Sequence, residues 1–238
     1  MIYHISSTTS TNDCLRDAKY REGDIVWADF QTAGRGQRGH AWSSAAGENL
    51  LFSVLLEPLF MPVAEQFLLS QTVAVSLADL FDGYGIGTRI KWTNDIYAVG
   101  RKLVGILIEH IYSGPKLART IVGIGINVNQ LEFDSSLPNP TSMALLTGER
   151  YDLHTVLERF AVILMNNYGG LRRGGGEQVR RRYGERLYRL GERHPFARPD
   201  GTRFEGIIRG VKPTGELIVE QGDGTAVEYR FKEIEFVL

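Results

Sequence analysis

The most informative stretch of this chain, residues 31–42, reads Gln31-Thr32-Ala33-Gly34-Arg35-Gly36-Gln37-Arg38-Gly39-His40-Ala41-Trp42. Its three glycines give the backbone conformational freedom and leave amide groups open to a ligand. Arg35 and Arg38 offer planar donor groups that suit phosphate or carboxylate, and Trp42 adds a large apolar surface. The stretch predicts a loop that holds an anion and closes over it. A solvated surface connection is the plain alternative.

The segments on both sides of this loop, residues 24–30 and 50–56, have the apolar character of buried strands. Further strands are expected at residues 2–5, 89–92, 102–111 and 117–128, and a turn near Gly100 predicts a hairpin between 96–99 and the strand that follows. Capping side chains at residues 10–13 indicate a helix start. Longer amphipathic helices are expected from Pro62 to Phe81 and around residues 153–164.

The character of the chain changes after about residue 190. Short strands are expected at residues 204–209, 216–220, 226–231 and 234–237, with turn signals at 212–215 and 221–224. This pattern predicts a small β-barrel. The chain therefore divides into two expected domains, 1–190 and 191–238.

Composition excludes several classes of protein. The 238 residues suit one large domain with a small appendage, and 43% hydrophobic and 23% charged residues are typical of globular proteins. A net charge of −1 gives no sign of a general nucleic-acid binder. No apolar run reaches the length of a membrane span, and the N-terminus does not resemble a signal peptide, so we expect a cytoplasmic protein. A single cysteine, Cys14, excludes an internal disulfide, and the five histidines have no metal-ligand spacing.

A second constellation runs from Lys91 to Asp95 and continues at residues 101–107. Lys102 opens an apolar strand, so its ammonium must reach solvent, a partner or a ligand anion; a lysine that protects a sheet edge is the alternative. Gly105 within the strand indicates either a close approach by a ligand or backbone, or a simple bulge. Asp95 taken alone is more typical of a turn cap.

A third constellation reads Ile121-Val122-Gly123-Ile124-Gly125-Ile126-Asn127-Val128-Asn129. Side chains alternate along a strand, so Gly123, Gly125 and Asn127 share one face and leave a shallow groove. Asn127 at the end of this groove could bind an amide-like edge such as that of adenine. Tight sheet packing explains the glycines equally well.

In this order, the motifs resemble those of the biotin protein ligase family. The matching segments are Ser10-Thr11-Asn12, residues 31–42, 91–95, 101–107 and 123–127. The resemblance implies an α/β (α+β) fold in which a mixed β-sheet is flanked by helices, with residues 1–190 as the catalytic domain and 191–238 as an SH3-like barrel. It also implies a two-step reaction, in which biotin and ATP form biotinyl-AMP and a lysine of a biotin carboxyl carrier domain then accepts the biotin. Magnesium would accompany the ATP.

The resemblance also implies a role for individual residues. Lys102, Arg35 and Asp95 would be catalytic. Biotin would contact Ser10, Thr11, Gln31, Gly34, Gly105, Gly123 and Gly125. ATP and the adenylate would contact Arg38, Gly39, Trp42, Lys102 and Asn127. Many members of the family have a further arginine where this chain has Gln37 or His40, so the charge of the loop is lower here. The helix-turn-helix domain of repressor-type members is missing, which predicts no DNA binding.

Other interpretations make different predictions. A dinucleotide-binding Gly34-x-Gly36-x-x-Gly39 motif needs a helix that opens at Gly39. A lipoate or octanoate transferase on the related fold would prefer another acid, and residues 172–176, which resemble the lipoate ligase motif, follow a long helix rather than a strand. A non-catalytic biotin-binding or carrier-binding module would bind biotin without releasing pyrophosphate. A monomer and a homodimer are both compatible with the sequence.

Overall fold

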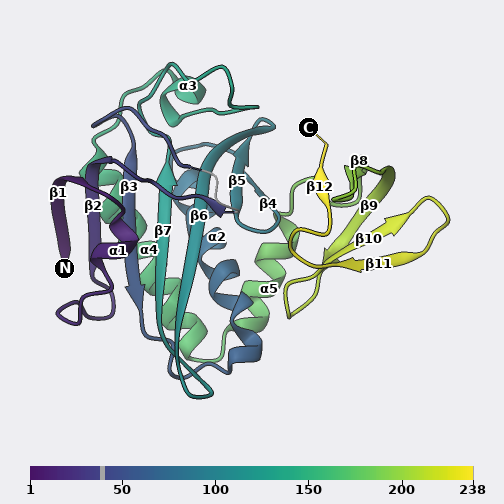
Figure 1. Ribbon diagram of the computed structural model, residues 1–238, viewed down its shortest axis with the longest axis horizontal. Helices are drawn as coiled ribbons and strands as arrows, with labels where there is room; N and C mark the ends of the chain where they lie inside the picture. The colour runs from purple at the N-terminus through teal and green to yellow at the C-terminus, as the bar shows by residue number, and fades with distance from the viewer. Residues whose placement is uncertain (38–40, 238) are drawn as a thin grey trace.

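The large β-sheet of this protein is mixed and has seven strands. The computed structural model describes residues 1–37 and 41–237. The strands lie in the order β1-β2-β3-β7-β6-β5-β4; β1 and β2 are parallel, and every other neighbouring pair is antiparallel (Figure 1). Their bounds are β1 (Ile2–Thr8), β2 (Ile25–Gln31), β3 (Leu50–Leu56), β4 (Arg89–Lys91), β5 (Asp95–Ala98), β6 (Arg101–Ser113) and β7 (Lys116–Ile126). The expected strands and the 96–99 hairpin are confirmed.

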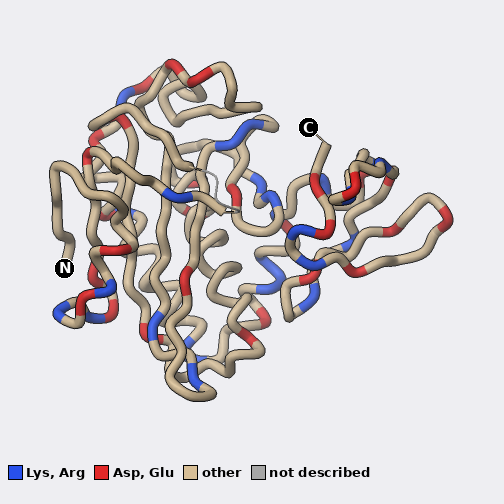
Figure 2. The backbone as a smooth tube through the Cα atoms, in the orientation of Figure 1, with Lys and Arg blue, Asp and Glu red and all other residues tan. Residues whose placement is uncertain are grey.

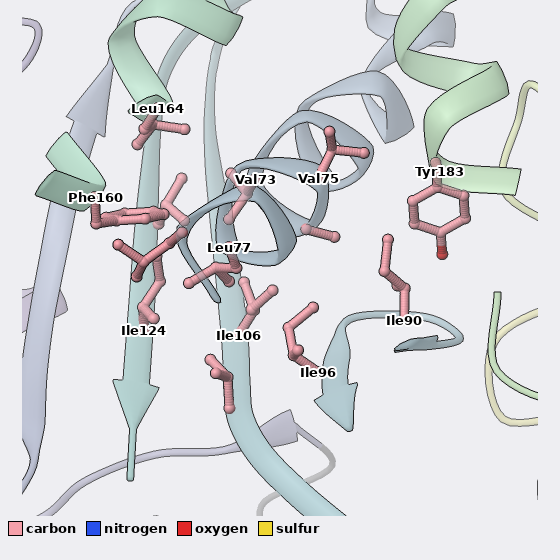
Figure 3. Packing of buried hydrophobic residues seen from close by; sticks show 14 of the residues in the cluster. Val73, Val75, Leu77, Ile90, Ile96, Ile106, Ile124, Phe160, Leu164 and Tyr183 are labelled. Atoms are coloured by element: carbon pink, nitrogen blue, oxygen red, sulfur yellow. The ribbon is translucent and has the colours of Figure 1, made fainter. Parts of the chain in front are cut away.

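One face of this sheet carries the long helices and the main core. The helices are α1 (Thr11–Cys14), the 3₁₀ turn η2 (Val63–Glu65), α2 (Phe67–Asp82), α3 (Met143–Thr147), α4 (Leu153–Arg172) and α5 (Gly176–Glu185). Figure 3 shows Leu77 of α2 and Phe160 of α4 pointing toward Ile106 and Ile124 on the sheet. Because strand side chains alternate, the neighbours of these isoleucines along each strand face the opposite side of the sheet. Among the described residues, no long helix covers that side. The helix start at residues 10–13 is confirmed, but α1 is a single turn.

The C-terminal strands form a second sheet that is antiparallel and open. Its order is β11-β10-β9-β8-β12, with bounds β8 (Arg193–Ala197), β9 (Arg203–Val211), β10 (Leu217–Gln221), β11 (Ala226–Tyr229) and β12 (Glu235–Phe236). Within residues 191–237, β11 and β12 do not pair, so the expected barrel is not closed. The reason is that β12 has two residues, and both pair with β8.

The two sheets share one hydrophobic core. Ile208 of β9 and Leu217 of β10 belong to the same buried cluster as α2 and β7. The indole N–H of Trp92 donates a hydrogen bond to the carbonyl oxygen of Gly215 at 2.9 Å. Figure 2 shows basic residues gathered where the two sheets meet.

In the described parts of the chain, no helix combines the length and the apolar character that a membrane span requires.

Candidate active site

A cavity of about 550 Å³ opens on the sheet face opposite α2 and α4. It collects residues from all five motif segments, although these are far apart in sequence. The expected site residues that line it are Ser10, Thr11, Gln31, Arg35, Trp42, Asp95, Lys102, Gly105, Gly123, Gly125 and Asn127. Gly34 lies beside the cavity, where a Cβ would stand 2.5 Å from the carbonyl oxygen of Trp42. Arg38 and Gly39 lie outside the described residues.

The end of the cavity nearest β2 is polar. Thr11 begins α1, and its backbone N–H donates to Oε1 of Gln31, the last residue of β2, at 2.8 Å. The Thr11 hydroxyl lies 3.1 Å from the same oxygen and 2.7 Å from the hydroxyl of Ser53. The carbonyl of the Gln31 side chain is therefore held in place by the protein.

The glycines of β6 and β7 make room for protein side chains. A Cβ on Gly105 would stand 2.6 Å from Cζ3 of Trp42, and a Cβ on Gly125 would overlap the same indole. A Cβ on Gly123 would overlap the side-chain amide of Asn12. The sequence predicted a ligand, backbone or bulge at Gly105; the structure places the Trp42 ring there, and the bulge lies at Leu103. The indole N–H of Trp42 is buried and has no hydrogen-bond partner among the described residues.

At the β5–β6 end of the cavity stands an ion pair. The Lys102 ammonium lies 2.8 Å from Oδ1 of Asp95, and the two side chains are 35% and 24% exposed. A β-bulge at Leu103 makes this pairing possible. Lys102 and Gly105 are three residues apart and would face opposite sides of a regular strand, but the extra residue returns Lys102 to the cavity face.

A strap of residues 139–141 fixes the backbone at Lys102. The N–H of Lys102 donates to the carbonyl of Asn139 at 2.8 Å, and its carbonyl accepts from the N–H of Thr141 at 2.9 Å. The same strap orients Asn127, which is buried and whose Nδ2 donates to the carbonyl of Thr141 at 2.9 Å. Lys102 is thus a held cation beside a cavity, and not a lysine on a sheet edge.

Arg35 is paired with a carboxylate of α1. Its two terminal nitrogens each lie 2.8 Å from one oxygen of Asp13, and one of them lies 3.8 Å from Glu109. The hydrogen bond from Arg35 is the main reason why the pKa of Asp13 lies below its usual value, although partial burial opposes it. The same bond raises the pKa of Arg35. The guanidinium therefore fastens the glycine-rich loop to α1 at the edge of the cavity.

Several cavity neighbours were not identified from sequence. The C-terminal sheet region contributes Phe231, Ile234 and Phe236 to the wall. The Lys91 ammonium lies over the rings of Tyr97 and Phe236, 5.3 and 4.8 Å from their centroids. The contact between Lys91 and Phe236 joins residues more than a hundred positions apart, which no local sequence pattern predicts.

The geometry contradicts the dinucleotide interpretation. Residues 41–49 form no helix, and the next regular element is the strand β3. A pyrophosphate-binding turn of that type needs a helix N-terminus directly after the third glycine.

Comparison with known proteins decides the family. Residues 1–127 match the biotin/lipoate A/B protein ligase family. The chain belongs to this family. The bifunctional ligase/repressor BirA of Bacillus subtilis is 33% identical over 230 residues, which cover 94% of this chain and 70% of that protein. The biotin–[acetyl-CoA-carboxylase] ligase of Paracoccus denitrificans is 31% identical, with 94% and 95% covered.

The fold of this biotin/lipoate ligase family member agrees with that of a solved relative. The biotin protein ligase from Aquifex aeolicus, determined in complex with biotin and ATP, superposes with a TM-score of 0.83 at 26% identity. The match covers 98% of this chain and 97% of the other, so it includes the C-terminal sheet. The expected fold class is therefore confirmed, with the C-terminal sheet open rather than closed.

Proposed function

We propose that this chain is an ATP-dependent biotin protein ligase, which forms biotinyl-AMP and transfers the biotin to a lysine of a biotin carboxyl carrier domain. One arrangement carries the proposal. From β2 to β5 the cavity presents a polar end at Thr11 and Gln31, an aromatic floor at Trp42, and the Lys102–Asp95 ion pair. This order suits an acid with a polar ring, an apolar chain and a terminal carboxylate.

In the first step, biotin's ring would lie against Thr11 and Gln31 with its chain across Trp42. An oxygen of the biotin carboxylate attacks the α-phosphorus of ATP and forms a new P–O bond to it. The bond between the α-phosphorus and the oxygen that bridges it to the β-phosphorus breaks, and pyrophosphate leaves. Lys102 stabilises the negative charge on the carboxylate and α-phosphate, because a cation that the protein already holds in position needs little reorganisation during the reaction. Asn127 would contact adenine, and Arg38 and Gly39 would contact the phosphate.

In the second step, an acceptor lysine attacks the mixed anhydride. The new C–N bond forms, the C–O bond to phosphate breaks, and AMP leaves. A lysine with a pKa of about 10.4 is neutral in only about one molecule in 2,500 at pH 7. Asp95 would attract this ammonium and take up the proton that the amine loses as it attacks.

The glycine-rich loop and the second sheet complete the proposal. Gly34 and Arg35 would hold the loop over the adenylate, which shields the anhydride from water. Magnesium would enter with the triphosphate. Phosphate oxygens and water would be its main ligands. Residues 191–238 would act as the SH3-like domain and 1–190 as the catalytic domain, in a cytoplasmic enzyme.

The family includes lipoate ligases, so the acid is the point to test. ATP–pyrophosphate exchange should be measured with biotin, lipoate and octanoate. Exchange that depends on biotin and fails in Lys102→Ala supports the proposal. Exchange with lipoate or octanoate alone assigns the chain to the sister activity, and binding of biotin without exchange assigns it to a non-catalytic module.

A further inference from the structure

A chain of polar side-chain contacts leads from Glu109 on β6 to the polar end of the cavity. Glu109 accepts from Nδ2 of Asn12 at 2.7 Å, and Oδ1 of Asn12 lies 2.5 Å from the hydroxyl of Ser53. The Ser53 hydroxyl lies 2.7 Å from that of Thr11, which lies 3.1 Å from Oε1 of Gln31. Asn12, Ser53 and Thr11 are all buried. Ser53 and Glu109 do not line the cavity.

Chemistry fixes the direction of both amides in this chain. An ionised carboxylate only accepts, so Asn12 turns its NH₂ group to Glu109 and its oxygen to Ser53. At the other end, the backbone N–H of Thr11 only donates, so Gln31 turns its oxygen to Thr11. The two hydroxyl groups therefore stand between two acceptors.

Two hydroxyl hydrogens must serve three oxygen–oxygen contacts. A contact without a hydrogen places lone pairs against each other, so the hydrogens belong in the two shorter contacts. Ser53 then donates to Asn12, and Thr11 donates to Ser53. The Thr11 hydroxyl could instead donate to Gln31 at 3.1 Å, but a hydrogen given to Ser53 leaves none for that contact. Both of these oxygens become acceptors at the cavity, 3.1 Å apart.

We propose that Ser53 and Glu109 are positioning residues that fix this polarity, so that the end of the cavity at Thr11 and Gln31 selects a ligand ring carrying an N–H donor. The inference rests on the proposed function, because the ureido N–H groups of biotin are such donors and a straight-chain acid has none. Gly123 supports the arrangement. It lies opposite Ser53 in the β3–β7 register, and any Cβ there would displace the Asn12 amide.

Two variants with matched controls test the proposal. Ser53→Ala removes the middle hydroxyl. Ser76→Ala removes an equally buried hydroxyl in α2, which donates to the backbone carbonyl oxygen of Thr72. Glu109→Gln lets Asn12 turn over. Glu48→Gln alters a carboxylate of similar exposure that pairs with Arg150 as Glu109 pairs with Arg16, although Glu109 also lies 3.8 Å from Arg35. Biotin-dependent ATP–pyrophosphate exchange is measured for each, with biotin and with its two mono-N-methyl derivatives.

The expected result is a KM for biotin about three- to tenfold higher in Ser53→Ala and Glu109→Gln, the loss of roughly one hydrogen bond. The KM for ATP and kcat stay within twofold, and both controls behave as wild type. Wild type should prefer biotin to one of the two N-methyl derivatives. This preference should be smaller in both variants. An unchanged biotin KM and an unchanged preference would overturn the proposal.

Other outcomes are also decisive. If wild type shows no exchange with biotin, the proposed function fails, independently of the hydrogen-bond chain. If Ser53→Ala does not fold, the partly exposed Glu109→Gln carries the test. If kcat and the affinities for biotin and ATP all worsen to the same extent in both variants, the residues are merely structural and the proposal is wrong.

Discussion

The Lys102 ammonium and the Asp95 carboxylate face each other at 2.8 Å because a bulge at Leu103 turns Lys102 onto the cavity side of β6. In the proposed reaction this pair serves two steps in turn. Lys102 acts on the anions of adenylation, and Asp95 acts on the amine of transfer. Substitution of each residue should therefore separate the steps.

Lys102→Met should lower biotin-dependent exchange by about 10²- to 10³-fold, as the loss of a preorganised charge partner does. Asp95→Asn should keep exchange within a few-fold of wild type and lower transfer to the carrier by at least about 10²-fold, the size of a lost general base. Exchange and single-turnover transfer are measured separately. Lys212→Met, which breaks the exposed Lys212–Glu228 pair, is the control and should change neither. Equal losses of both steps in Asp95→Asn would contradict the division of roles.

Gly125→Ala should disturb Trp42, because the added Cβ would overlap the indole. We expect a loss of about 1–3 kcal/mol in the free energy of unfolding, typical of overpacking, and weaker exchange. Most of this cost should disappear in a Trp42→Ala background, which urea unfolding of the single and double variants can show. Gly170→Ala in α4, where a Cβ meets nothing within 4 Å, should instead be neutral or slightly stabilising. Equal costs with and without the Trp42 ring would refute the steric account.

Asp13→Asn should destabilise the protein at neutral pH by less than about 1 kcal/mol, because the Asp13–Arg35 pair is substantially exposed. The pKa of Asp13 is lowered from 3.8 in the folded state, so the pair's contribution is complete above that value and is lost as the pH falls through the lower, folded pKa. Urea unfolding of wild type and variant from neutral to strongly acidic pH measures the difference. Arg35→Met should show the same convergence. A difference that stays constant into strong acid would speak against the linkage.

Gln37→Arg should slow the release of the adenylate by about tenfold or more, because Gln37 lines the cavity and a charge-assisted hydrogen bond is worth roughly 1.5–3 kcal/mol. The rate is measured by chasing preformed adenylate with unlabelled biotin. Gln178→Arg adds the same charge on the exposed surface of α5 and should leave release unchanged. Equal effects of the two variants would point to net charge alone.

The sequence predicted the strands of the large sheet well, because their apolar runs are long; residues 50–56 agree with β3 in full. The shorter or polar elements α3, α5 and β8 were missed. The α5 helix begins in a glycine run and is rich in arginine, and β8 contains Pro195 and a charged first residue. Neither has the periodic apolar face that a local pattern needs.

The sequence likewise indicated some residues of the candidate site and missed others. Lys102 stands out because charge in an apolar strand requires a partner, whereas Asp95 taken alone is more typical of a turn cap. Strand alternation alone places Lys102 on the side of β6 away from Gly105, and the bulge returns it to the cavity face. Gly105 and Gly125 were predicted to leave space for ligand; the structure places Trp42 against both glycines, and their contact with biotin stays a prediction. Ser53 and Glu109 carry no sequence signal, because their importance comes from hydrogen bonds between distant segments.

The most direct test of the account is mass spectrometry of a purified biotin carboxyl carrier domain after incubation with this protein, ATP and biotin. We predict the mass of one biotinyl group on a single lysine of the carrier, no modification without ATP, and none when that lysine is arginine. Modification by lipoate or octanoate in place of biotin, or no modification despite biotin-dependent pyrophosphate exchange, would contradict the account.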